Sequence, residues 1–276
     1  MQPFPLSFLL FLYQVALGGL FALAATPFHE LERGFYKSTA GVLFVAALLS
    51  FLGKANLYLI SGSEAMKPGA SADIVFHFFF LALFALYLIS LWGERAYLRA
   101  RAFSFALFIG LAGLTLSSHA FRQTPLWSLE TFLYPVSFLL SALLLGGVTV
   151  GMLIGHWYLI DTGQSIAPFI RIFKFFVFCL VAQTAYLLAL PLSLVLVGNA
   201  ETLSRLERLW EDHFLLLSGR VIVAQLAPLV LSFMIWRTLK IPHTMAATGL
   251  FYIALLGVFV GEILGKQILA LTYLPF

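Results

Sequence analysis

Long apolar runs dominate the chain, and polar positions gather in short stretches between them. Eight of these runs reach about 19 residues or more, which is enough to cross a bilayer core roughly 30 Å thick. Because the runs are continuous and do not alternate between apolar and polar positions, they predict spanning helices rather than barrel strands. We expect one all-α polytopic membrane domain over residues 1–276. The spans are placed at residues 5–26, 38–59, 72–93, 102–119, 130–158, 169–197, 216–237 and 246–273.

The stretch 200–214 differs from the spans because its charged and apolar positions separate on a helical wheel. Its apolar face consists of Leu203, Leu206, Trp210 and Phe214. This pattern predicts an external amphipathic helix that either lies in the plane of the membrane interface or docks on its own protein. The other connections are short, and the stretch 61–71 is typical of a turn-rich loop.

Small residues recur every four positions in the fifth and eighth runs. These glycines are Gly147, Gly151 and Gly155, followed by Gly257, Gly261 and Gly265. Glycine at this spacing lets helix backbones approach closely, so that van der Waals contact can hold helices together in lipid. Similar stripes in the first and fourth runs favour two four-helix bundles, with halves 1–120 and 128–276 related by a parallel repeat.

The composition supports this fold class. Of 276 residues, 62% are hydrophobic and only 10% are charged, whereas a soluble domain carries roughly 25% charged residues. So little charge cannot cover a water-facing surface, which excludes a soluble enzyme and a nucleic-acid-binding protein. The single cysteine, Cys179, excludes an internal disulfide and a thiolate metal cluster.

Basic residues are distributed unequally between the two sets of loops. Eight spans place both termini on one side of the membrane. The loops on the opposite side hold nine Lys and Arg residues and those on the terminal side hold six, with Lys266 left out because it lies inside the last span. The positive-inside rule therefore predicts that both termini lie outside.

Ionisable side chains near the predicted outer face form the main candidate site. Asp73 and His77 are four residues apart, so they share a helix face, and the carboxylate could orient the imidazole. His119, Arg220 and Glu262 are expected at the same membrane level. Quinone chemistry needs a hydrogen-bond donor to each carbonyl and a route for two protons, and histidine with a carboxylate supplies both. We therefore expect these five residues to bind a quinone, such as menaquinone.

Structural roles compete with this interpretation. Glu262 and Lys266 are four residues apart and could form a structural ion pair, since intramembrane charges pair with one another. Gln14, Gln183 and Gln225 lie at mid-depth, where amide side chains bridge helices by hydrogen bonds.

Two other functions remain open. A b-type cytochrome would use histidines as haem ligands, and His77 with His119 is the best pair near the outer face. The six histidines divide equally between the two faces: His77, His119 and His213 outside, and His29, His156 and His243 inside. A secondary transporter would fit the glycines and the prolines inside spans, but not the absence of mid-depth charge.

The predicted topology resembles the NrfD/PsrC/DmsC-like quinol-interacting membrane subunits of respiratory oxidoreductases. The shared features are eight spans, both termini outside, a four-plus-four arrangement, and His, Arg and carboxylate side chains near the outer face. The resemblance implies a subunit that passes electrons between membrane quinone and an iron–sulfur or cytochrome partner docked outside. It also implies a multi-pass protein of the bacterial inner membrane, in contact with lipid. The resemblance is one of topology, and no residue role is carried over from it.

Overall fold

A computed structural model of the chain describes residues 3–28, 30–61, 70–121, 128, 130–161, 163, 165–241 and 243–276. His29 and most of the predicted 61–71 loop lie outside the described residues.

The described elements are all helical. The N-terminal half contains α1 (Pro3–Ala24), α2 (Arg33–Ser61), α3 (Ala70–Ser90) and α4 (Ala96–His119). The C-terminal half contains α5 (Glu130–Ile160), α6 (Ala167–Val197), α7 (Ala200–Asp212), α8 (Phe214–Val221), the π-helix η2 (Ile222–Leu226), α9 (Ala227–Lys240) and α10 (Thr244–Thr272). Within the described residues, eight helices are long and apolar enough to cross a membrane, with α8, η2 and α9 forming one of them. The predicted fold class is therefore confirmed.

Several helices begin earlier than their apolar runs. The second run was placed from residue 38 and the fourth from residue 102, whereas α2 begins at Arg33 and α4 at Ala96. Apolarity marks the part of a helix that lies in hydrocarbon. The helices continue past it, because charged side chains such as Arg33 and Arg101 are exposed and can be solvated at the interface.

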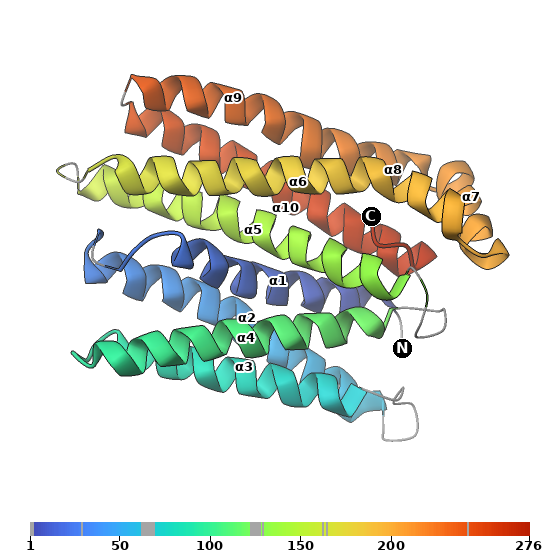
Figure 1. The fold of residues 1–276 in the computed structure, drawn as a ribbon, viewed down its shortest axis with the longest axis horizontal. Coiled ribbons are helices and arrows are strands. Elements are labelled where there is room, and N and C mark those ends of the chain that lie inside the picture. The colour runs from blue at the N-terminus through green and yellow to red at the C-terminus, as the bar shows by residue number, and fades with distance from the viewer. Residues whose placement is uncertain are drawn as a thin grey trace.

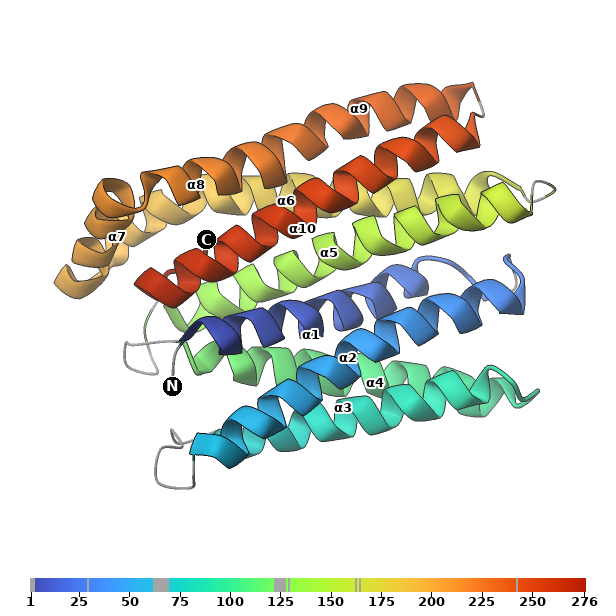
Figure 2. The same cartoon turned by 180° about the vertical axis from the view of Figure 1, so that it is seen from behind.

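The helices fall into two groups that follow the order of the chain (Figures 1 and 2). Helices α1–α4 pack on one another, and α5, α6, α9 and α10 form the second group. The groups meet where α1 packs on α5, with α10 also on α1 and α4 also on α5. Both termini lie at one end of the molecule, which we call the termini end, and we call the opposite end the far end.

The crossing of α1 and α5 brings two backbones into direct contact. A Cβ atom on Gly18 would lie 1.6 Å from the carbonyl oxygen of Ala142, and one on Gly146 would lie 1.9 Å from the carbonyl carbon of Gly18. Only glycine fits at both positions, since backbone atoms cannot turn aside as a side chain can. Gly146, which is not in the predicted stripe, therefore helps to join the two halves.

The predicted glycine stripes pack at other helix contacts. A Cβ on Gly151 would lie 2.4 Å from the ring of Phe251, where α5 meets α10. A Cβ on Gly261 would lie 2.0 Å from the Cβ of Ala224, where α10 meets η2. The packing role expected for these glycines is confirmed.

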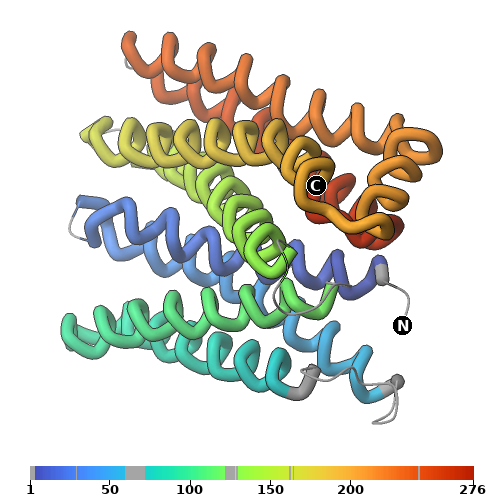
Figure 3. Tube along the Cα trace, turned by 45° about the vertical axis from the view of Figure 1, so that its right-hand side comes forward, coloured from blue at the N-terminus to red at the C-terminus, as the bar shows by residue number. Residues whose placement is uncertain are grey.

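Helix α7 docks on its own protein. It packs against α6, α8 and α10, and its buried residues include Thr202, Leu206 and Leu209. Of the predicted apolar face, Leu206 is buried, whereas Trp210 and Phe214 remain exposed. Figure 3 shows α7 at the end where the C-terminus lies.

Candidate functional site

A buried network of charged and amide side chains lies in the second group of helices. Arg220 on α8 and Glu262 on α10 are both 0% exposed. The Oε1 atom of Glu262 accepts hydrogen bonds from Nη2 of Arg220 at 2.7 Å and from Nε2 of Gln183 at 2.6 Å. The Nζ atom of Lys266 lies 3.6 Å from the other carboxylate oxygen. Two cations thus share one carboxylate where water cannot screen them, which makes the carboxylate the centre of the network.

The network extends away from Glu262 through amide groups. Nε2 of Gln225 donates to Oε1 of Gln183 at 3.4 Å, and the Thr184 hydroxyl donates to Oε1 of Gln225 at 2.7 Å. In the other direction, Nε2 of Gln183 donates to the Ser141 hydroxyl at 3.2 Å. Helices α5, α6, η2 and α10 are therefore tied together by side chains. The expected bridging role of Gln183 and Gln225 is confirmed, and Gln14 likewise donates to the Phe138 carbonyl oxygen at 2.8 Å.

The π-helical turn η2 shapes this part of the site. Pro228 follows it, and a proline ring clashes with the carbonyl four residues earlier in a regular α-helix. The chain instead widens by one residue, and the N–H of Ala227 bonds to the carbonyl of Ile222. Within the widened turn, Ala224 packs on Gly261 and Gln225 bonds to α6.

Arg220 has unused hydrogen-bonding capacity. Its Nε and Nη1 atoms are buried and have no hydrogen-bond partner among the described residues. Gly265 makes room for the side chain, because a Cβ there would lie 2.9 Å from Nε of Arg220 and 2.7 Å from the Phe276 carbonyl oxygen. A buried donor without an acceptor costs roughly 1–3 kcal/mol. An acceptor supplied by a ligand would therefore be stabilising at this position.

An apolar pocket of about 330 Å³ adjoins Arg220. Its lining includes Leu187, Pro191, Trp210, Phe214, Arg220 and Phe276. Arg220 is the one charged residue of the lining, and the rings of Trp210 and Phe214 lie 6.0 Å apart. Because Arg220 is 0% exposed, it lies at the bottom of the pocket, behind the other lining side chains. The volume falls at the lower end of the range for small-molecule sites.

A second buried cluster lies in the first group of helices. Oδ2 of Asp73 lies 2.9 Å from Nζ of Lys54 and accepts from the Tyr58 hydroxyl at 3.3 Å. Oδ1 accepts from the Ser117 hydroxyl at 2.5 Å. The orienting contact expected from Asp73 to His77 is not formed, since no hydrogen bond joins the two side chains among the described residues. The Lys54 side chain, from the neighbouring helix α2, engages the carboxylate instead.

His77 is enclosed by aromatic rings. It is buried, and its ring centroid lies 4.4 Å from that of Tyr13 and 5.7 Å from that of Phe51. His119 is half-buried at the C-terminal end of α4. Neither histidine lines the pocket beside Arg220. A haem held by these two residues stays a prediction.

The five candidate residues do not form one constellation. Asp73 and His77 lie on α3 in the first group, whereas Arg220 and Glu262 lie on α8 and α10 in the second. Helices α1 and α5 stand between them (Figure 1). The sequence placed these residues by depth alone, and depth does not determine which helices are neighbours.

Comparison with protein families finds no match for this chain, and comparison with curated proteins finds no relative. The geometry of the Arg220 pocket is therefore the basis for a functional proposal.

Proposed function

We propose that the protein binds a membrane quinone or quinol in the pocket beside Arg220. One observation carries this proposal: a buried guanidinium with two unpaired nitrogen atoms, Nε and Nη1, lies at the bottom of an apolar, aromatic-lined pocket. The flanking residues Leu188 and Ile222 are apolar and exposed, as lipid-facing side chains are. A lipid-soluble molecule with a polar acceptor at one end matches this arrangement.

Each side chain has a distinct role on this proposal. Arg220 donates a hydrogen bond to a head-group carbonyl once a lining side chain such as Phe276 moves aside. Trp210 and Phe214 flank the ring through their aromatic faces. Glu262 holds the guanidinium in place, and Lys266 supplies a second proton-bearing group behind it. The apolar wall formed by Leu187 and its neighbours on α6 would contact the isoprenoid tail.

We further propose that the protein is a membrane subunit of a respiratory complex in the bacterial inner membrane. An iron–sulfur or cytochrome partner would exchange electrons with the quinone. The termini end is the favoured docking face, because α7 presents exposed charged side chains there. These are Glu207, Arg208, Glu211 and Asp212.

The binding test uses purified protein in lipid nanodiscs, titrated calorimetrically with a short-chain menaquinone analogue. We expect Arg220→Gln to weaken binding by at least tenfold, about the loss of one charge-assisted hydrogen bond. Ser218→Leu fills the same pocket without changing the ion pair and is expected to weaken binding similarly. Arg208→Gln makes the same charge change on the exposed face of α7 and serves as the control.

The outcomes separate the proposal from a loss of folding. Weakened binding in Ser218→Leu with normal thermal unfolding supports the pocket. Unchanged affinity in both Arg220→Gln and Ser218→Leu would show that the quinone does not bind there.

A further inference from the structure

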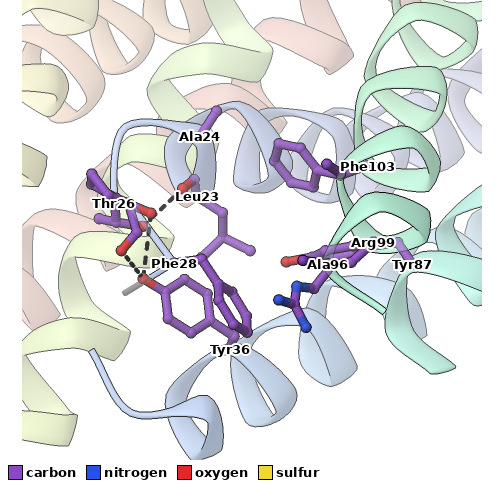
Figure 4. Close-up of a pocket in the computed structure, with 11 residues that line it drawn as sticks. Leu23, Ala24, Thr26, Phe28, Tyr36, Tyr87, Ala96, Arg99 and Phe103 are labelled. Carbon is purple, nitrogen blue, oxygen red and sulfur yellow. Dashed lines mark hydrogen bonds between the residues drawn. The ribbon is translucent and has the colours of Figure 1, made fainter. Parts of the chain in front are cut away.

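A second pocket, of about 300 Å³, lies at the far end of the first group of helices. It is formed by the end of α1, the connection to α2, and the adjoining parts of α2, α3 and α4 (Figure 4). Its lining includes Leu23, Thr26, Phe28, Tyr36, Arg99 and Phe103. Neither the proposed quinone site nor the Asp73 cluster shares a residue with this far-end pocket.

Arg99 is the one charged residue in the lining of the far-end pocket. Its guanidinium carbon lies 3.8 Å from the ring centroid of Phe28, and Figure 4 shows the group directed toward the rings of Phe28 and Tyr36. No described carboxylate forms an ion pair with Arg99, and its Nη1 atom is buried without a hydrogen-bond partner. The cation is thus held in place by stacking while its N–H groups stay available to an anion.

Hydrogen bonds within the protein also hold the part of the pocket wall beneath Arg99 in place before any ligand binds. The Tyr36 hydroxyl donates to the Pro27 carbonyl oxygen at 2.6 Å, and the Thr26 hydroxyl donates to the Leu23 carbonyl oxygen at 2.8 Å. These bonds hold the turn after α1, which carries Phe28 and therefore the face on which Arg99 stacks. A preorganised site loses less conformational entropy when a ligand binds.

Polarity changes along the far-end pocket. Arg99 lies in the first turn of α4, and Phe103 lies one turn deeper, about 6 Å farther along the helix axis. Arg99 therefore lies nearer the helix end, and the ring of Phe103 lies nearer the membrane core. A molecule with an anionic head and an apolar body would bind in this orientation.

The surrounding charge favours the same class of ligand. The far end carries nine basic residues: Arg33, Lys37, Arg95, Arg99, Arg101, Arg171, Lys174, Arg237 and Lys240. Of the nearby carboxylates, Glu30 is engaged by Arg171, whereas Glu32 and Glu94 are exposed. Basic residues at a membrane surface attract anionic lipids.

We propose that the far-end pocket binds an anionic phospholipid, with its phosphate on Arg99 and an acyl chain against Phe103. Arginine suits this role because its planar N–H groups match the oxygens of a phosphate. The bound lipid would fill the space between α1, α2 and α4 and stabilise their packing at this end.

The test uses delipidated protein in detergent and follows thermal unfolding as lipid is added. Phosphatidylglycerol, phosphatidylcholine and inorganic phosphate are compared. We expect phosphatidylglycerol to raise the unfolding temperature, since a ligand that binds the folded state stabilises it. Arg99→Gln is expected to need about tenfold more phosphatidylglycerol for the same rise. Arg101→Gln is the matched control, because Arg101 is two residues along α4 and stacks on Tyr97 outside the pocket.

A second variant guards against a general folding defect. Ala100→Leu narrows the far-end pocket while leaving Arg99 unchanged, and it should reduce the effect of phosphatidylglycerol but not the unfolding temperature without lipid. Equal losses in Arg99→Gln and Arg101→Gln would show a diffuse effect of surface charge and overturn the proposal. Equal protection by inorganic phosphate would identify an anion site rather than a lipid site, and equal protection by phosphatidylcholine would contradict anionic selectivity.

Discussion

At the scale of single residues, Glu262 lies at the centre of the buried charged network. It is buried with two cations and an amide donor around one carboxylate. Removing one member of a buried ion pair leaves the others without compensation, which is more damaging than replacing the pair as a whole. Stability and the proposed quinone site therefore depend on the same side chain.

We expect Glu262→Gln to lower the free energy of unfolding by about 3–5 kcal/mol, because Arg220 and Lys266 lose their counter-charge. Glu201→Gln removes the carboxylate of an ion pair with Arg205 in which Glu201 itself is exposed, and it should cost less than about 1 kcal/mol. Denaturant unfolding in detergent micelles measures both. Similar losses in the two variants would contradict the central role of Glu262.

The sequence identified which buried polar residues matter, but it did not identify the pairs in which they make contact. Depth along each span selected Arg220, Glu262 and the two glutamines. The same reasoning paired Asp73 with His77 because they share a helix face. It could not foresee that Lys54, on another helix, lies 2.9 Å from Asp73. Spacing along one helix describes only local neighbours, whereas the strongest buried contacts here join different helices.

At the scale of helices, the contact of α1 with α5 sets the geometry of the molecule. The sequence predicted small-residue packing, and the stripe through Gly151 does meet α10. It did not show that Gly146, one position from the stripe, meets Gly18 on another helix. Successive residues of a helix point about 100° apart, so one glycine-rich segment can serve two partners. Which neighbouring helix contacts each side of α5 depends on the tertiary packing, and the sequence of α5 alone does not show it.

Gly146→Ala is expected to destabilise the fold strongly, because its Cβ would overlap the backbone of Gly18 and Gly19. Gly249→Ala is the control, since no atom lies within 4 Å of the Cβ position on that glycine of α10. Exchanging an uncrowded helical glycine for alanine is neutral or slightly stabilising. Thermal unfolding and size-exclusion profiles of the two variants should differ clearly. Equal behaviour would mean that the crossing tolerates a wider separation.

At the scale of the whole molecule, the number of spans followed from the physics of the bilayer. A segment that crosses hydrocarbon must be apolar over a fixed length, and this requirement is visible in the sequence. The grouping of the helices depends on contacts between α1, α4, α5 and α10. Those contacts rely on shape rather than polarity, so the hydropathy pattern does not encode them.

The orientation predicted from the nine and six basic residues can be tested by cysteine labelling in intact cells. Asp212 is exposed at the termini end and Glu94 is exposed at the far end. We expect a membrane-impermeant maleimide added outside to label Asp212→Cys in intact cells and Glu94→Cys only after permeabilisation. The native Cys179 is buried and should stay unlabelled. The reverse pattern would place both termini inside.

The ion pair between Arg220 and Glu262 also bears on biogenesis, because it joins two consecutive spans. An unpaired charged residue inside an inserting helix is costly, up to roughly 2.5–3.5 kcal/mol at the bilayer centre. Entry of Phe214–Lys240 and α10 as one hairpin allows the charges to meet at the translocon before either faces lipid. We therefore expect a chain that stops after Lys240 to hold the Phe214–Lys240 span in the bilayer less firmly, because Arg220 would lack the carboxylate of Glu262.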